Sequence, residues 1–158
     1  IIFMKITKER RVFLHSALAL ISSLLLPTKV FSRWDGNAYN KADITDSIFS
    51  VGVTNPGDLV EANDIIDLSL PEIAENGAIV PITVRSEVLN TERIFIFAEK
   101  NPQPLVSDYV FSDGVEPFVA SRIKMSETAF VHVIVLANGT FYRASRQVKV
   151  TIGGCGEE

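Results

Sequence analysis

The chain has 158 residues, of which 47% are hydrophobic, and its 15 Lys and Arg against 19 Asp and Glu give a formal net charge of −4. This length suits one domain with one hydrophobic core. The acidic balance argues against nucleic acid or an anionic membrane as a partner, because both carry negative charge themselves.

The first 32 residues have the pattern of an export signal. The pair Arg10 and Arg11 stands in a basic segment, and a mostly apolar run follows over residues 16–26. This run is shorter than the roughly 20 residues that a membrane-spanning helix needs. We therefore predict that residues 1–32 are a twin-arginine signal peptide, with Met4 as the natural start. The alternative is an N-terminal helix of the folded domain, but the arginine pair precedes the apolar block in the order that a signal requires.

Cleavage after Ser32 leaves a more acidic protein of 126 residues. It removes five of the 15 basic residues and one of the 19 acidic ones, so ten and 18 remain and the formal net charge becomes −8. The cleaved protein is expected to be periplasmic and to keep no membrane anchor. Its single cysteine, Cys155, excludes an internal disulfide.

One short helix is predicted to precede a series of strands. Ile44, Ile48 and Phe49 recur at helical spacing within residues 41–51, and the turn-forming residues 55–57 are expected to end this helix. Seven later runs have the alternation or the apolar length of strands, and turn-forming residues separate them. These runs are residues 65–70, 79–84, 93–98, 106–111, 118–125, 129–137 and 141–152.

Two of these runs and one turn between runs carry further detail. Pro81 indicates an edge or a bulge, because it cannot donate a backbone hydrogen bond. The run 129–137 is apolar almost throughout, which predicts a strand buried on both faces. Asn138-Gly139 predicts a tight hairpin turn. Together the seven strands predict an all-β, immunoglobulin-like antiparallel β-sandwich over residues 33–152, with a short N-terminal helix.

The last six residues, 153–158, are predicted to form a flexible swinging arm. Three glycines, Gly153, Gly154 and Gly156, flank Cys155 and give the segment little bulk and wide backbone freedom. An extended chain would carry Cys155 about 10 Å beyond residue 152. A lone cysteine is often a small buried hydrophobe, but here two glutamates and the terminal carboxylate would have to be buried with it. We interpret Cys155 as a functional thiol.

Other chemistries lack the residues that they need. His15 would leave with the signal and His132 lies within the most apolar strand, so no ligand cluster for zinc or copper is visible. We predict no catalytic residue, because a thiol beyond the fold has no histidine base held against it. We also predict no metal site and no cofactor. Four carboxylates near strand ends are interpreted as solvated side chains: Asp64, Asp67, Glu72 and Glu75.

Four segments resemble characteristic segments of one family. They are residues 70–77 (LPEIAENG), 80–84 (VPITV), 96–102 (IFAEKNP) and 148–156 (VKVTIGGCG). They are similar to SoxY, the sulfur-carrier subunit of the bacterial Sox system that oxidises thiosulfate. The likeness extends over nearly the whole chain after residue 32.

The resemblance implies a function for Cys155. It would be the covalent attachment point for thiosulfate-derived intermediates, and the chain would be a carrier and not an enzyme. The resemblance also implies a heterodimer with a SoxZ-like subunit, and transient contacts with the haem-containing, hydrolase and dehydrogenase enzymes of the Sox system. An unperturbed thiol, with a pKa of about 8.5, is only a few per cent thiolate near neutral pH, so the partner enzyme must activate it.

One departure from the family and two alternatives remain. The family usually ends Gly-Gly-Cys-Gly-Gly, whereas this chain has Glu157 and Glu158 after the last glycine. These carboxylates should disfavour the thiolate. The alternatives are a secreted β-sandwich adaptor whose thiol forms an intermolecular disulfide, and a SoxY-like carrier that serves another periplasmic oxidation route.

Overall fold

The computed structural model describes residues 36–152, which belong to one compact unit beginning at Asp35. The predicted signal peptide, with Arg10 and Arg11, lies outside the described residues. So does the predicted arm, with Gly153, Gly154, Cys155 and Gly156. Neither described helix is long and apolar enough to cross a membrane.

Two short helices precede the strands. They are α2 (Gly36–Tyr39) and α3 (Ile44–Ser50), and a 3₁₀ turn, η1 (Pro56–Asp58), follows them. Asp43 begins α3, because its Oδ1 accepts hydrogen bonds from the backbone N–H of Thr45 at 2.7 Å and of Asp46 at 3.2 Å. The predicted helix over 41–51 is therefore confirmed in its centre. The helix ends at Ser50, before the expected stop at 55–57. Two residues after its end, Gly52 takes a φ of 111°, which glycine adopts readily.

Ser47 is an unusual residue in α3. Its side chain is fully buried, and its hydroxyl has no hydrogen-bond partner within the described structure. A buried hydroxyl without a partner costs free energy that an alanine does not. We therefore expect Ser47→Ala to leave the free energy of unfolding unchanged or to raise it by up to about 1 kcal/mol. Urea denaturation would measure this, and a clear loss of stability would show that the hydroxyl has a stabilising partner.

Nine strands follow within the described residues. Their bounds are β1 (Leu59–Glu61), β2 (Ile66–Ser69), β3 (Ile73–Ala74), β4 (Val80–Ser86), β5 (Thr91–Ala98), β6 (Leu105–Val110), β7 (Phe118–Ile123), β8 (Ala129–Ala137) and β9 (Thr140–Val150). Seven of them correspond to the predicted runs. The two that were not predicted, β1 and β3, have three residues and two residues.

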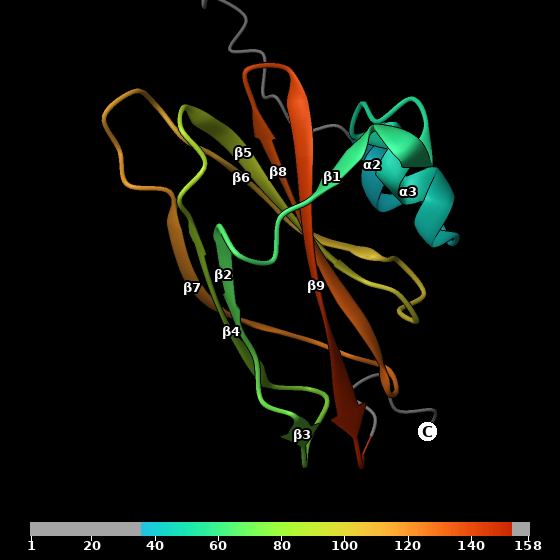
Figure 1. The fold of residues 1–158 in the computed structure, drawn as a ribbon. Helices are drawn as coiled ribbons and strands as arrows, with labels where there is room; N and C mark the ends of the chain where they lie inside the picture. The colour runs from blue at the N-terminus through green and yellow to red at the C-terminus, as the bar shows by residue number, and fades with distance from the viewer. Residues whose placement is uncertain (1–35, 153–158) are drawn as a thin grey trace, which may run out of the picture. The chain divides into compact units, whose positions relative to one another are not determined.

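The strands form two sheets (Figure 1). The larger has the order β1-β9-β8-β5-β6, with β3 also paired to β9, and the smaller has the order β2-β4-β7. Most neighbours are antiparallel, but β1 and β3 both run parallel to β9. The predicted immunoglobulin-like β-sandwich is confirmed, with this parallel pairing along β9 as an addition.

The main core lies between the two sheets. Alternate residues of β4 and β8 point inward and are almost fully buried, among them Val80, Ile82, Val131 and Val133. Burial of such side chains contributes about 1.5–3 kcal/mol each. The inward face of β9 adds Ala144 and Val148, so the last strand is built into this core.

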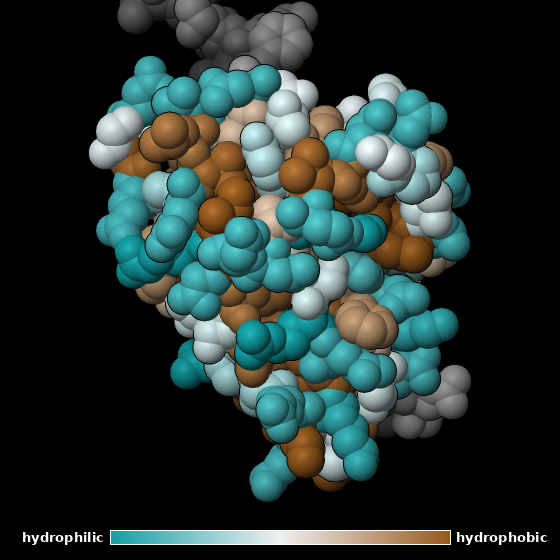
Figure 2. All heavy atoms as spheres, in the orientation of Figure 1, coloured by the Kyte–Doolittle hydropathy of each residue, from teal (hydrophilic) through white to brown (hydrophobic). Residues whose placement is uncertain are grey.

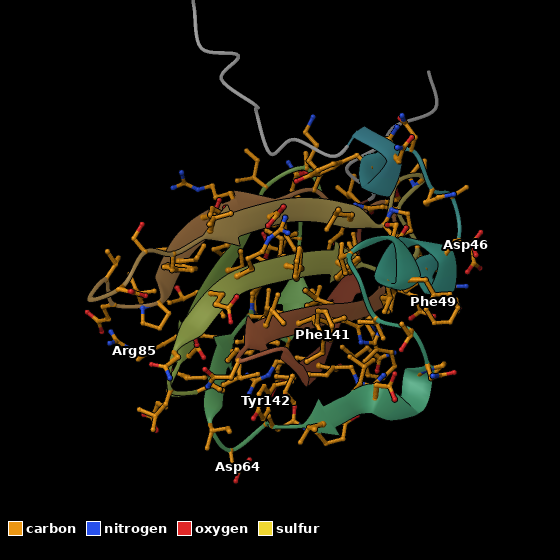
Figure 3. All side chains as sticks on the ribbon, turned by 90° about the horizontal axis from the view of Figure 1, so that it is seen from above. Asp46, Phe49, Asp64, Arg85, Phe141 and Tyr142 are labelled. Carbon is orange, nitrogen blue, oxygen red and sulfur yellow. The ribbon has the colours of Figure 1, made fainter. Side chains whose placement is uncertain are left out.

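A second, smaller core explains why β8 is buried on both faces in its middle. Phe95, Phe97, Leu105 and Ile134 lie on the opposite face of the larger sheet, and Ile44 and Ile48 of α3 pack against them. Phe141 of β9 joins this cluster, and Figure 3 labels it in a view down on the end of the sandwich where the helices lie. The helices thus cover one part of the outer face of this sheet.

Two local predictions have clear outcomes. Asn138 and Gly139 take φ values of 50° and 74°, so the hairpin turn between β8 and β9 is confirmed. Pro81 lies in β4, the middle strand of the smaller sheet, where it pairs with Arg122 of β7. However, β2 pairs only with the other end of β4, from Thr83 to Ser86, so Pro81 stands where β4 has one strand neighbour. The edge character predicted from the proline is confirmed locally.

Candidate functional site

The described part of the chain ends at the base of the predicted arm. β9 ends at Val150, and Thr151 and Ile152 continue it to within three residues of Cys155 in the sequence. The geometry that the structure gives for the site is therefore the way in which this strand end is held.

One side of the strand end is held by residues 72–77. β3 pairs with β9 in parallel, with Ile73 opposite Lys149 and Ala74 opposite Val150. The backbone N–H of Lys149 donates to the carbonyl oxygen of Glu72 at 2.9 Å, and that of Thr151 donates to Ala74 at 3.1 Å. The pairing therefore continues one residue past the end of β9.

Two further hydrogen bonds extend this hold to Ile152. The Thr151 hydroxyl donates to the carbonyl oxygen of Glu75 at 2.9 Å. The backbone N–H of Gly77 donates to the carbonyl oxygen of Ile152 at 2.7 Å, and the carbonyl of Gly77 accepts from Met125 N–H at 2.7 Å. Since Met125 is fully buried, this chain of bonds connects Ile152 to the main core.

Thr128 holds the other side. Its Oγ1 accepts from the backbone N–H of Val150 at 2.9 Å and lies 3.3 Å from the Val150 carbonyl oxygen, to which it donates. We call residues 72–77, Thr128 and residues 149–152 together the arm-base clamp. Figure 1 shows β9 ending beside β3 at the lower end of the sandwich.

The sequence of the segment 70–77 explains its shape. Leu70 and Ala74 are buried in the main core and anchor the segment. After β3 the chain turns at Asn76, whose side-chain Oδ1 accepts from the backbone N–H of Ala78 at 2.8 Å. The carboxylates of Glu72 and Glu75 are exposed, as predicted, and the clamp uses the backbone of these residues.

The clamp has a geometric consequence for Cys155. With Ile152 fixed, the thiol can reach no farther than about three extended residues, or about 10 Å, from that point. The maximum reach of the thiol is therefore set by the length of residues 153–155. Residues at the end of β9 could extend it only if the hydrogen bonds of the clamp broke.

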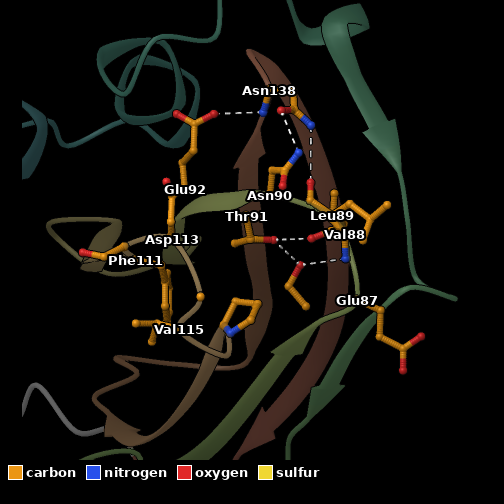
Figure 4. A pocket seen from close by; sticks show the side chains of 14 residues that line it. Glu87, Val88, Leu89, Asn90, Thr91, Glu92, Phe111, Asp113, Val115 and Asn138 are labelled. Atoms are coloured by element: carbon orange, nitrogen blue, oxygen red, sulfur yellow. Dashed lines mark hydrogen bonds between the residues drawn. The ribbon is translucent and has the colours of Figure 1, made fainter.

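A cavity of about 660 Å³ lies at the other end of the sandwich (Figure 4). It is lined by residues 86–92, which join β4 to β5, by residues 111–115 and Pro117, and by Asn138. Thr91 is paired with Ala137 at that end of β8, whereas Ala129 at the other end is paired with Val148 near the arm base. The cavity is therefore separated from the arm base by the length of β8.

His132 lies in β8, as its place in the apolar run 129–137 predicted, and its side chain is partly buried and packed. Its Nδ1 lies 2.7 Å from the Ser145 hydroxyl, and its ring stacks on Phe130 with centroids 6.0 Å apart. Burial lowers the pKa of His132 below its usual range, and the Arg143 guanidinium lowers it further. Within residues 36–152, no group of three or more His, Cys, Asp or Glu side chains could hold a metal ion.

The lowered pKa of His132 predicts a pH dependence of stability. Just below pH 6.5, the usual pKa, the unfolded chain binds a proton that the folded chain does not. Stability should therefore fall as the pH drops through about 6.5 and level off below the folded-state pKa. His132→Gln should flatten this part of the curve. Melting temperatures of both proteins between about pH 8 and pH 5.5 would check this, and parallel curves would contradict it.

The fold and the clamp define a class: a two-sheet β-sandwich protein whose last strand is held to its end on both sides. The family model of the sulfur oxidation protein SoxY matches residues 53–155, which include the whole clamp and end at Cys155. The chain belongs to the SoxY family.

Two solved structures are similar to the chain. The sulfur carrier protein SoxY from Chlorobium limicola f thiosulfatophilum is 37% identical, with a TM-score of 0.62, and the alignment covers 70% of this chain and 97% of that one. A superoxide reductase (neelaredoxin) from Ignicoccus hospitalis is 13% identical, with a TM-score of 0.50 and coverage of 62% and 99%, and shows the fold alone. No curated protein sequence matches the chain at the level of similarity required.

Proposed function

We propose that the chain is a periplasmic sulfur carrier that holds thiosulfate-derived intermediates covalently on Cys155. The observation that carries this proposal is the match to the SoxY family over the segment that ends at the only cysteine. The related structure from Chlorobium limicola is titled a sulfur carrier protein, which supports the same role here.

The chemistry on the thiol has three stages. In the first, a haem enzyme joins thiosulfate to Cys155: the thiol loses its proton, a sulfur–sulfur bond forms, and the haem groups take up an electron pair. In the second, a hydrolase adds water across the terminal sulfur–sulfur bond. Sulfate then leaves, and one sulfur atom stays on the cysteine as a persulfide. In the third, the dehydrogenase takes up electrons from the outer sulfur while water supplies its oxygen atoms. A second hydrolysis then breaks the bond between this sulfur and the cysteine sulfur, so the oxidised sulfur leaves as an oxyanion and the thiol is regenerated.

The arm-base clamp supports this division of labour. A carrier must present one atom to several enzymes in turn, so the arm needs a thin, free end and a fixed origin. The glycines of the predicted arm give it a thin, free end. The hydrogen bonds to Thr151 and Ile152 fix its origin. The carrier itself contributes attachment and reach, and the enzymes contribute the catalytic groups.

The proposed function also requires a location and partners for the protein. The twin-arginine signal would export the folded chain to the periplasm, and a SoxZ-like subunit would form a heterodimer with it. The haem-containing, hydrolase and dehydrogenase enzymes would bind in turn. No resident cofactor is needed, because the covalent sulfur is cargo.

A loading experiment tests the proposal. Purified, reduced protein is incubated with thiosulfate and a periplasmic extract of thiosulfate-grown cells, and its intact mass is then measured with and without a reductant. A thiosulfate-dependent adduct that the reductant removes is expected. Only free thiol and a disulfide-linked dimer would favour the adaptor alternative instead.

A further inference from the structure

Three large apolar side chains are exposed around the arm-base clamp. Ile73, Ile79 and Ile152 are 57%, 58% and 68% exposed. Figure 2 shows hydrophobic side chains at the surface of this end of the sandwich, where β3 lies. We refer to these three isoleucines as the arm-base rim.

Each residue of the rim is tied to the clamp through the backbone. Ile73 adjoins Ala74, which accepts the hydrogen bond from Thr151, and Ile79 follows Gly77, which donates to Ile152, by two residues. Two residues span at most about 7 Å of chain, so the rim residues all lie close to the origin of the arm. Their main chains are held, and only their side chains face outward.

Single exposed apolar residues are common on proteins, so exposure alone does not mark an interface. The reach of Cys155 provides the second argument. From a fixed Ile152, the thiol extends at most about 10 Å, so an enzyme whose reacting atoms are recessed must bring its surface up to the base of the arm. Whatever surrounds the arm base is then covered by the surface around the enzyme's entrance.

We infer that the arm-base rim is the docking surface for the haem enzyme that loads Cys155, and that it meets an apolar collar around the entrance to that enzyme's active site. The inference rests on the proposed carrier function. We expect a permanent partner subunit to bind elsewhere, because a subunit seated on the rim would compete with the haem enzyme for it. A transient apolar contact of this kind gains affinity by burial and is released when the arm withdraws.

The test uses the variant Ile73→Ser/Ile79→Ser. Both substitutions keep the clamp, because the clamp bonds of this segment are made by backbone atoms. Leu89→Ser is the matched control, since Leu89 is 82% exposed and lines the cavity at the opposite end of the sandwich. The measurement is kcat/KM for thiosulfate-dependent loading of Cys155 by the purified haem enzyme. The rate of reaction of Cys155 with Ellman's reagent is measured beside it.

We expect the double variant to lose about tenfold in kcat/KM for loading, with an unchanged rate toward Ellman's reagent. Leu89→Ser should match the wild type in both measurements. If the double variant loads within twofold of the wild type, or if Leu89→Ser loses as much, the docking surface is refuted while the carrier function stands. A wild-type protein that the haem enzyme does not load would overturn both proposals.

Discussion

Cys155→Ser should abolish sulfur loading and leave the sandwich folded. Serine differs from cysteine by one atom, but its hydroxyl is a much weaker nucleophile than a thiolate and forms no bond to sulfur that a reductant cleaves. Because Cys155 is the only cysteine in the chain, no other thiol can replace it. The thiosulfate-dependent mass increase should fall below detection, and thiosulfate-dependent electron transfer to the haem enzyme should stop.

Stability is the control for this variant. Cys155 follows the last described strand in the sequence, on the predicted arm, so the free energy of unfolding should change by no more than about 0.5 kcal/mol. A variant that folds normally and still gains a reducible sulfur adduct would show that the attachment site is elsewhere. That result would contradict the proposed function at its central atom.

Deletion of Gly153 and Gly154 should lower the rate of enzymatic loading by about 100-fold or more. The arm-base clamp holds Ile152 through its carbonyl oxygen and Thr151 through its backbone and hydroxyl, so lost length is not recovered from β9. Deletion leaves one residue of reach, or about 3 Å in place of about 10 Å. Misplacement of a reacting atom by even 1 Å can cost about 100-fold in rate.

Two controls separate length from flexibility and from thiol chemistry. Gly153→Ala/Gly154→Ala keeps the length and should lose much less activity than the deletion. Ellman's reagent should react with the deletion variant at a rate near that of the wild type, because a small molecule needs no reach. If the deletion variant is loaded at the wild-type rate, the clamp does not fix the origin of the arm.

Most of the sandwich could be predicted because its strands carry their own signals. Residues 129–137 coincide with β8, and the Asn138-Gly139 turn has the positive φ values that its residue types favour. These features depend on residues next to each other in the chain. β1 and β3 were missed because they are too short to show a pattern, and they are strands only by their pairing with β9.

The candidate site also has one part that adjacent residues indicate and one part that only the folded chain brings together. The glycine pattern around Cys155 indicates an arm and a thiol from adjacent residues, but the clamp joins segments more than 70 residues apart. Its bonds come mostly from backbone groups, which every residue except proline supplies, so no residue type marks them. Segment 70–77 was recognised as characteristic of the family, and the structure adds its physical role, which is to hold the end of β9.

The most direct test of the carrier function is the mass of the C-terminal peptide from protein isolated from the periplasm of thiosulfate-grown cells, compared with and without reductant. We expect a mixture of masses on the peptide that contains Cys155, matching added sulfur and added thiosulfonate, all of which collapse to the free thiol on reduction. A peptide that carries only the free thiol, or only a disulfide to a second protein chain, would contradict the carrier function.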